Sequence, residues 1–592
     1  MTIRIITASS SNATKLPQLK RPYFKTQNFG AGYEMLPSLA AEEKLETVQR
    51  YRKALSEISG RLGISPGWIY SWTSTRDRHS SNVINNLELL NRLEKTLIEN
   101  SNRDLEIVIE DPYFGQVFTQ LARKLGVPIK LELSVRTTFA FRRLQLFKAA
   151  LRNILSSSKR WFQILRAASR YPKTAFEMKS ADCIIVSMFH NLPTNQPDGR
   201  LGDVYFGQLN ELISAMGQQV VLCGHILGDP DQILKSIGKL NKPNITFGHL
   251  LNWTDIFFAG FSTIISFVKL LAGYPWSCSD RRVAKLVFSD LLNASGDILS
   301  SLLIEKAMTK LLRKIPTEKV LLMYENHPWE VAVIQATKKI AESTRIVGYT
   351  HCAILKSHLK HLTAKDEKDG RPTPHQIITT GATARDVYQS ITDISPNRVL
   401  AGSNLSGPQL TEDTLRNSPP KKVKTILALF QGLPEMVGFV HFLAAAKEFV
   451  PNTRVVIRPH PIQFGLEKLI RESGIDIAQG ALLEPCLHSK LSDSLSEADV
   501  VIYKGSTAAM YAIYNGIPVI YFDDDWLISD DPLIETHALK VSVDCPSEIT
   551  QAIKEIENIT IADYKNQHQS ARMYVENYLA EPTSETTQAF LK

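Results

Sequence analysis

The sequence has few cysteines, and none are spaced as a metal-binding or disulfide-forming pair. Its six cysteines are scattered over 592 residues without a CxxC spacing. A cysteine-held zinc site or a disulfide framework is therefore not expected, and free thiols are typical of a reducing cytoplasm. The segment MTIRIITASSSNATKLPQ at residues 1–18 also lacks a continuous apolar core, so we expect no secretory signal.

Long apolar runs and internal repeats are missing as well. The most apolar stretch, Ile256–Val268, is bounded by Asp255 and Lys269 and is too short to span a bilayer, so it predicts a buried or interfacial helix. No tandem repeat or low-complexity tract is present. With 44% hydrophobic and 22% charged residues, the chain has an ordinary globular composition, and its length requires two or more domains.

Acidic residues are scarce in one segment, residues 141–180, although the net charge of the whole chain is only +8. Apolar residues recur there at helical spacing between arginines and lysines, which predicts a basic helical insertion made of an amphipathic helix pair. Such helices suit an anionic membrane surface, and a solvated hairpin packed on its own domain explains the pattern equally well. No nucleic-acid recognition motif accompanies the charge, so nucleic acid is not an expected partner.

Short β-branched runs alternate with helical stretches over most of the chain, which predicts an α/β fold. In the N-terminal half, the polar residues His190, Glu325 and His351 each follow a predicted strand. Because parallel strands share one carboxyl edge, these residues are expected on the floor of a cleft. The predicted strands of this half include 183–187, 219–222, 319–324 and 345–349.

A histidine stands at the end of another strand in the C-terminal half. The β-branched run 455–457 stops at Arg458-Pro459-His460-Pro461, because proline fixes its own φ and biases the preceding residue to extended forms. His460 is thereby held where open α/β sheets bind ligands. Gln431 and Gly432 follow the predicted strand 425–430 and are expected to reach the same ligand.

A pair of hydroxyls follows the next predicted strand, 500–503. Lys504 and Gly505 make a tight turn, and Ser506 or Thr507 stands at the start of a helix over 508–514. Backbone N–H groups and the positive helix end favour an anion such as a phosphate there. An ordinary N-cap and a strand-ending histidine, with no ligand, are the alternative interpretation.

Several short motifs resemble those of one group of bacterial enzymes. RPHP at 458–461 resembles the HP motif, and KGSTAA at 504–509 the paired-hydroxyl motif, of transferases that use CMP-activated sialic acid or Kdo. YENHPWE at 324–330 and GYTH at 348–351 resemble segments of bacterial surface carbohydrate biosynthesis proteins. The resemblance implies a GT-B-like α/β fold, with two Rossmann-type domains facing a cleft and extra helices in the N-terminal half.

The resemblance also implies an activity. It indicates a cytoplasmic glycosyltransferase, peripheral on the inner face of the cell membrane, metal-independent and inverting. The enzyme would move an acidic sugar from a CMP-linked donor to an oligosaccharide or lipid-linked glycan acceptor of a surface polysaccharide or lipopolysaccharide, without a further cofactor. The acceptor-side domain is expected at 1–370 and the nucleotide-sugar-binding domain at 371–560, because the charged, Gly/Pro-containing stretch 362–374 suggests a boundary. A closing helix at 561–592 is expected to pack back on the first domain.

In the resembling families the HP histidine and the hydroxyl pair hold the nucleotide phosphate. The expected donor-binding residues are therefore His460, Ser506 and Thr507, joined by their neighbours Arg458, Pro461, Lys504, Gly505, Gln431 and Gly432. Preorganised hydrogen-bond donors of this kind stabilise a departing phosphate.

The acceptor side departs from the family pattern. An acidic D/E-D/E-G motif is replaced here by Glu325-Asn326-His327, so Glu325 is the first candidate for the general base and Glu330 the second. His327, His351 and His190 are pocket candidates. The DDD run at 523–525 is expected to be a solvated loop, with no metal bound.

Two other functions fit the same patterns. One is a GT-B enzyme with a UDP-, GDP- or CDP-linked donor, or a sugar-nucleotide epimerase. The other is a non-catalytic scaffold of a polysaccharide assembly complex.

Overall fold

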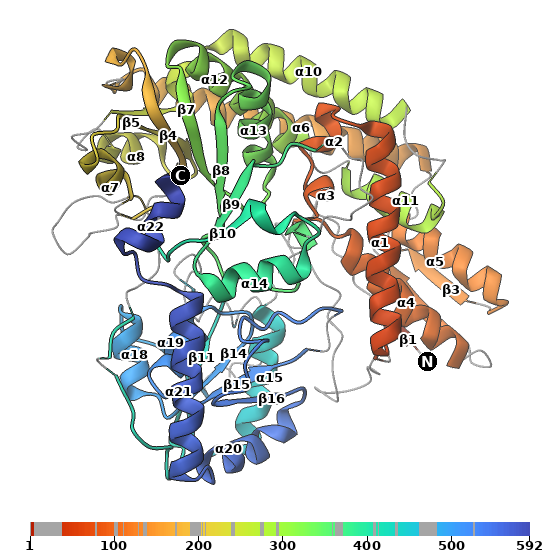
Figure 1. Cartoon of the computed structure of the whole chain (residues 1–592). Coiled ribbons are helices and arrows are strands. Elements are labelled where there is room, and N and C mark those ends of the chain that lie inside the picture. Colours follow the sequence, from red (N-terminus) through yellow and green to blue (C-terminus); the bar gives the residue numbers. More distant parts are fainter. Residues whose placement is uncertain are drawn as a thin grey trace.

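Two large parallel β-sheets organise the protein, and they form the upper and lower parts of Figure 1. A computed structural model describes residues 2–4, 38–76, 80–99, 105–109, 112–127, 129–133, 139–171, 174–189, 203, 205–207, 209–237, 243–272, 278–291, 295–357, 359–361, 371–405, 410–412, 414–431, 436–460, 470, 482–524 and 527–591.

The first large sheet has seven parallel strands in the order β10-β9-β8-β7-β4-β5-β6. The chain starts in the middle at β4, adds β5 and β6 on one side, and then crosses over to β7 on the other. The topological switch point, where ligands bind in open α/β sheets, therefore lies between β4 and β7. The strands are β4 (Ala181–Phe189), β5 (Val220–Ile226), β6 (Asn244–Thr246), β7 (Thr317–Met323), β8 (Arg345–Tyr349), β9 (Gln376–Thr379) and β10 (Val399–Ala401).

The second large sheet has six parallel strands in the order β13-β12-β11-β14-β15-β16, so its switch point lies between β11 and β14. Its central strands are almost wholly buried runs of valine, isoleucine and leucine, as expected when helices cover both faces. The two sheets confirm the predicted α/β class with two Rossmann-type domains. The strands are β11 (Thr425–Leu429), β12 (Arg454–Arg458), β13 (Leu483–Pro485), β14 (Val500–Tyr503), β15 (Val519–Phe522) and β16 (Lys540–Val543).

A small parallel sheet and a group of helices form the N-terminal part, on the right in Figure 1. Its strands, in the order β1-β2-β3, are β1 (Thr2–Arg4), β2 (Leu105–Ile109) and β3 (Ile129–Leu133). The helices up to the first sheet are α1 (Ala41–Leu62), α2 (Pro66–Ile69), α3 (Trp72–Thr75), α4 (Val83–Glu99), α5 (Pro112–Leu125) and α6 (Phe139–Ala168).

The remaining helices follow β4 in the chain. Helix α11 packs against α4 and α5 of the N-terminal part, and α10 packs against α6 and α12. The helices between β4 and β11 are α7 (Leu209–Ala215), α8 (Pro230–Ile237), α9 (Phe247–Leu250), α10 (Trp253–Ala272), α11 (Arg281–Leu291), α12 (Ser295–Lys314), α13 (Pro328–Ile340), η2 (Leu359–His361) and α14 (Ala382–Ile391). Those that follow are α15 (Met436–Phe449), α18 (Leu491–Glu497), α19 (Ala508–Tyr514), α20 (Ile549–Glu557), α21 (Ile561–Tyr578) and α22 (Ser584–Leu591).

The basic segment forms one long helix, α6, followed by the short turn η1 (Thr174–Glu177), so the predicted helix pair is wrong. The run Ser156-Ser157-Ser158 contains no proline or glycine that would end the helix. One face of α6 is buried, with Trp161 donating to Ser300 Oγ of α12 at 3.2 Å.

Strands β9 and β10 extend the first sheet, because β9 pairs with β8 and β10 pairs with β9. The predicted boundary between residues 370 and 371 therefore lies inside the first sheet, and the second sheet begins only at β11. A charged, Gly/Pro-containing loop between two strands of one sheet has the same composition as a linker between domains. This explains why the boundary was predicted too early in the chain.

The closing helices α21 and α22 contact the first sheet. Thr380, after β9, donates to the carbonyl of Tyr578 at 2.8 Å, and the Lys319 ammonium of β7 donates to the carbonyl of Leu591 at 2.5 Å. The C-terminal end of the chain thus bridges the two sheets.

Candidate functional site

The strand register of the second sheet places three predicted donor residues side by side. Leu429 of β11 pairs with Arg458 of β12 and with Tyr503 of β14. Two residues further along each strand, Gln431 therefore lies between His460 and Gly505. This is the carboxyl edge at the switch point of the sheet, the position at which such folds bind ligands.

Gln431 and Gly505 are in close contact. Gly505 has a φ of +64°, and a Cβ at this position would lie 2.1 Å from Nε2 of Gln431. Glycine is thus required both by the backbone conformation and by the approach of the amide. The Gln431 Nε2 is buried and has no hydrogen-bond partner among the described residues. A buried N–H group of this kind marks a place where a ligand can accept a hydrogen bond.

The two hydroxyls follow Gly505 directly and begin α19. Thr507 is the N-cap residue, but its side chain makes no capping hydrogen bond. Neither its hydroxyl nor that of Ser506 bonds to another described residue. The described residues therefore do not show an ordinary hydroxyl N-cap at this turn, and the binding of a ligand by the two hydroxyls stays a prediction.

His460 is half-buried at the end of β12. Burial lowers the pKa of its imidazole below its ordinary value, so the ring is neutral at pH 7. A neutral imidazole offers one N–H group as a donor. Pro461, Gly432 and His190 lie outside the described residues.

The two basic residues predicted at the donor site have partners within the protein. The Arg458 guanidinium donates to the carbonyls of His488 and Ser489, between β13 and α18, at 2.8 Å. It also donates to Ser494 Oγ on α18 at 2.7 Å. Lys504 is buried and forms an ion pair with Asp524. Both cations thus hold the loops around the predicted donor site.

Glu325 is the centre of a charged cluster at the switch point of the first sheet. It follows β7, and its side chain is 15% exposed. One carboxylate oxygen lies 3.0 Å from Lys360 Nζ and 3.3 Å from His327 Nε2, and the other lies 3.8 Å from His351 Nε2. The structure therefore brings the predicted residues Glu325, His327 and His351 together.

The two predicted carboxylates have different environments. Burial raises the pKa of Glu325, but Lys360, His351 and His327 lower it, and the balance leaves it well below its usual range. Burial and the charge of Glu325 raise the pKa of Glu330 well above its usual range. Glu325 is therefore ionised at neutral pH, which is the protonation state that a general base requires.

Glu330 has a structural position. It is fully buried, and one of its oxygens accepts the backbone N–H groups of Glu325 at 2.8 Å and His327 at 3.1 Å. It completes a capping box at the start of α13. Its carboxyl group does not reach the surface of the site, so Glu325 is the better placed of the two predicted bases.

Lys360 and Asn326 complete the cluster, and sequence reasoning missed both. Asn326 adopts a positive φ of 64° and donates to the carbonyl of Lys360 at 2.7 Å. This bond holds the turn after β7 against η2, which carries the buried ammonium. The YENHPWE motif, which contains Asn326, was the sequence signal that could have pointed to that residue. No local pattern pointed to Lys360, because it is separated from Glu325 by 35 residues.

Two aromatic rings border the histidines. Trp72 of α3 meets His327 edge-on at 5.2 Å, and Tyr205 meets His351 edge-on at 4.6 Å, measured between ring centroids. Trp72 comes from the N-terminal helices, which thus contribute to the wall of this site. Aromatic side chains beside a polar cluster are suited to stack on a sugar ring.

Glu325, His351 and Cys352 place one oxygen, one nitrogen and one sulfur atom within 4.8 Å of one another, and these atoms could hold a metal ion. The ammonium of Lys360 already lies 3.0 Å from the same carboxylate and would repel a divalent cation.

The DDD run at 523–525 follows β15. Asp523 and Asp524 are partly buried, and Asp524 forms an ion pair with Lys504. Asp525 lies outside the described residues.

The carboxyl edges of the two large sheets face each other. Lys356, in the loop after β8, forms a 2.9 Å ion pair with Glu535, in the loop after β15. The amide of Asn404 lies 3.5 Å from the hydroxyl of Tyr511 on α19. The loops that carry the two sites therefore meet at one interface between the domains.

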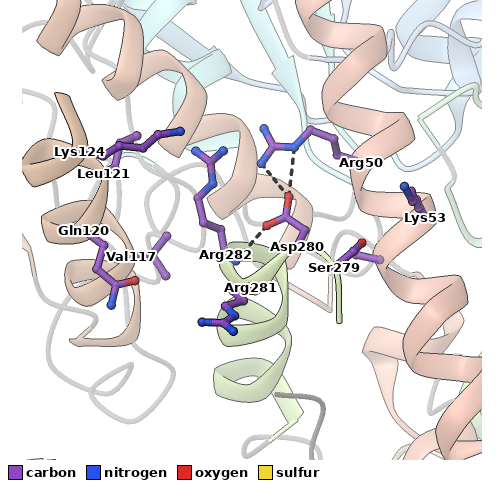
Figure 2. Close-up of a pocket in the computed structure, with 11 residues that line it drawn as sticks. Arg50, Lys53, Val117, Gln120, Leu121, Lys124, Ser279, Asp280, Arg281 and Arg282 are labelled. Atoms are coloured by element: carbon purple, nitrogen blue, oxygen red, sulfur yellow. Dashed lines mark hydrogen bonds and ion pairs between the residues drawn. The ribbon is translucent and has the colours of Figure 1, made fainter. Parts of the chain in front are cut away.

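A separate pocket of about 630 Å³ lies among the N-terminal helices α1, α5 and α11 (Figure 2). Asp280 is the only acidic residue among the described residues that line it, and it binds Arg50 at 2.8 Å. Its positive charge suits an anionic group, but none of its lining residues belongs to either strand-end site. The cations in the lining are Arg50, Lys53, Lys124, Arg281 and Arg282.

No family model and no curated protein matches the chain. Among solved structures, it is similar to the calicheamicin glycosyltransferase CalG4, with 12% identity and a TM-score of 0.38 over 70% of this chain and 98% of that chain. It is similar to a UDP-GlcNAc 2-epimerase from Neisseria meningitidis, with 10% identity and a TM-score of 0.39 over 69% and 98%. It is also similar to the wall teichoic acid polymerase TagF, with 10% identity and a TM-score of 0.34 over 76% and 96%. At these identities and TM-scores, function has to be argued from the residues of this chain.

Proposed function

We propose that this protein is a GT-B-type glycosyltransferase whose second sheet binds a nucleotide-sugar donor and whose first sheet presents the base for the acceptor. The observation that carries this proposal is the buried amide N–H of Gln431 beside Gly505, which has no hydrogen-bond partner in the part of the chain that the structure describes. It lies at the switch point of the second sheet. A nucleotide phosphate supplies the missing acceptor oxygen at a place where open α/β sheets bind such groups.

The donor side supplies hydrogen bonds to the leaving group. The phosphate gains negative charge as the glycosidic bond breaks, so fixed donors stabilise the transition state more than the ground state. The imidazole of His460, the hydroxyls of Ser506 and Thr507, and the amide of Gln431 are the groups in position. Arg458 and Lys504 hold the surrounding loops.

The acceptor side supplies the base. Glu325 is ionised, partly exposed and fixed by Lys360 and the two histidines. As the acceptor oxygen forms its bond to the anomeric carbon, its proton passes to the Glu325 carboxylate. Trp72 and Tyr205 are placed to pack against the acceptor sugar.

The donor is proposed to be a CMP-linked acidic sugar of the sialic acid or Kdo type, and the acceptor a growing surface polysaccharide or lipopolysaccharide. The RPHP and KGSTAA motifs support this choice, because they follow β12 and β14, the two strands that pair with β11. We propose an inverting, metal-independent reaction: EDTA is expected to leave turnover unchanged, and a loss restored by Mn²⁺ or Mg²⁺ would contradict this.

The test is a donor hydrolysis assay with a panel of CMP-, UDP-, GDP- and CDP-linked sugars. We expect hydrolysis of a CMP-linked donor, and a loss of about 10²–10³ in kcat for His460→Ala, as found when one preorganised donor is removed. Glu325→Gln is expected to abolish transfer to the acceptor while CMP binding is retained.

The outcomes separate the remaining alternatives. Turnover of a UDP-, GDP- or CDP-linked sugar alone would keep the fold and the site but change the donor, and formation of an epimerised nucleotide sugar would indicate an epimerase. If no donor binds and neither variant alters glycan production in cells, the site is not catalytic and the scaffold interpretation holds.

A further inference from the structure

Helix α10 exposes a large apolar surface on the outside of the first domain. It is 20 residues long, and in the window Trp253–Leu270 only 28% of the residues are buried. In Figure 1 it runs along the top edge of the molecule, with its neighbours on one side only. Its exposed apolar residues, each 36–69% exposed and here called the α10 face, are Trp253, Phe257, Phe258, Phe261, Ile264, Ile265 and Val268.

These residues form one continuous stripe. Trp253, Phe257, Phe261, Ile264 and Val268 follow a spacing of four, four, three and four, which keeps them on one side of a helix. Single exposed apolar residues are common on soluble proteins, but a stripe of this length, beside the further exposed residues Phe258 and Ile265, marks an interaction surface. Tryptophan and phenylalanine are also the residues favoured where a helix lies in a membrane interface.

By length and composition α10 could cross a membrane, which corrects the prediction that the segment is too short. Its inner side, however, is anchored to the domain. Asp255 is buried and binds Lys306 at 2.7 Å and Lys310 at 2.6 Å, both on α12. Crossing a bilayer would break these ion pairs and expose the apolar residues of the helices beneath. The helix therefore suits a position parallel to a surface.

Positive charge borders the α10 face. Lys269 is exposed on α10 itself, and the Lys306 ammonium lies 5.8 Å from the centre of the Phe258 ring. Helix α6 lies beside α10, where Ala150 packs against Phe267. One side of α6 is exposed at helical spacing over Lys148, Arg152, Leu155, Lys159, Phe162 and Arg166.

We propose that the α10 face and the exposed side of α6 dock the protein onto an anionic lipid surface, with α10 lying in the plane of the membrane. Apolar side chains then enter the acyl boundary while the cations contact acidic headgroups. A second copy of the chain is less suited to cover this surface, because it would bring the cations of both copies together. The inference is independent of which donor the proposed transferase uses.

Vesicle flotation of the full-length protein tests the proposal. We compare vesicles of phosphatidylcholine with vesicles of an equal mixture of phosphatidylcholine and phosphatidylglycerol. We expect binding to the mixed vesicles that weakens with salt. The variant Trp253→Ser/Phe257→Ser/Phe261→Ser should lose affinity on the order of a hundredfold or more, since its three large side chains no longer leave water.

The charges are tested separately. Lys148→Gln/Arg152→Gln/Lys159→Gln should lose affinity for the mixed vesicles on the order of a hundredfold, because each removed cation lowers the affinity about fivefold. Phe449→Ser is the matched control, because Phe449 is an exposed phenylalanine on α15 of the second domain. All these side chains are exposed, so unchanged circular dichroism and thermal midpoints are expected for each variant.

Three results would overturn the proposal. The first is a failure of the wild type to bind the mixed vesicles, and the second is an α10 variant that binds them as tightly as the wild type. The third is a wild-type dimer in light scattering that becomes a monomer in the α10 variant. Donor hydrolysis without vesicles should be unchanged in these variants. A failure of docking is therefore distinguishable from a failure of the proposed transferase function.

Discussion

Replacing Lys360 by methionine removes the ammonium that faces Glu325 and keeps a side chain of similar length. Both partners are largely buried, with 7% of Lys360 and 15% of Glu325 exposed. Breaking a buried ion pair by removing one partner costs about 3–5 kcal/mol. We expect about 3 kcal/mol here, because His327 and His351 still lie beside the carboxylate.

Differential scanning fluorimetry measures the effect. A loss of about 3 kcal/mol lowers the midpoint of a domain of this size by roughly 6–12 °C. Lys339→Met is the matched control, because Lys339 pairs with Glu305 at 2.7 Å but is 54% exposed. An exposed pair contributes at most about 1 kcal/mol, so this variant should stay within a few degrees of the wild type.

The pH dependence identifies the carboxylate as the cause. The folded pKa of Glu325 is depressed, so its stabilising contribution is present above the pKa of the unfolded carboxyl and is lost as the pH falls through the folded pKa. Without Lys360 the folded pKa rises. The difference in stability between the variant and the wild type should therefore be largest near neutral pH and shrink below about pH 4.

The same change tests Glu325 as a base. Its higher pKa in Lys360→Met should move the acid limb of the pH–activity profile to higher pH. If the midpoint of Lys360→Met matches that of Lys339→Met, or if the acid limb does not move, the Glu325–Lys360 pair does not have the role argued here.

Three further changes test the surrounding structure. Gly505→Ala should abolish donor binding in titration calorimetry. The φ of +64° at this position strains alanine, and the added Cβ would lie 2.1 Å from Gln431 Nε2. An unchanged affinity for CMP would contradict the placement of the donor site beside Gly505. Arg458→Met should lower the thermal midpoint by several degrees while CMP still raises it, because the guanidinium binds the loop between β13 and α18; a variant of normal stability without CMP affinity would indicate direct phosphate contact. In urea unfolding, Glu330→Gln should lower the free energy of unfolding by about 1 kcal/mol and Glu330→Ala by about 2–3 kcal/mol. Glutamine keeps an acceptor for the backbone N–H groups after β7, whereas alanine does not. Equal losses in the two variants would exclude the capping role.

The sequence by itself determined where the strands end and which residues follow them. Proline after β12, glycine after β14 and the buried β-branched runs are local signals, and local backbone sterics act through them without help from distant residues. His460, Gly505 and Glu325 could therefore be placed at strand ends, and the α/β class followed from the alternation of elements.

Only the tertiary structure decided which of these residues meet and which are already engaged. The order of strands put Gln431 between His460 and Gly505, and the folding of η2 against β7 brought Lys360 to Glu325 across 35 residues. Glu330 was the second candidate for the base in the sequence, and the fold buries it as a cap of α13. Such assignments depend on strand pairing and long-range packing, which local residue patterns do not encode. The domain boundary is a further case, because a loop inside a sheet and a linker between sheets have the same composition.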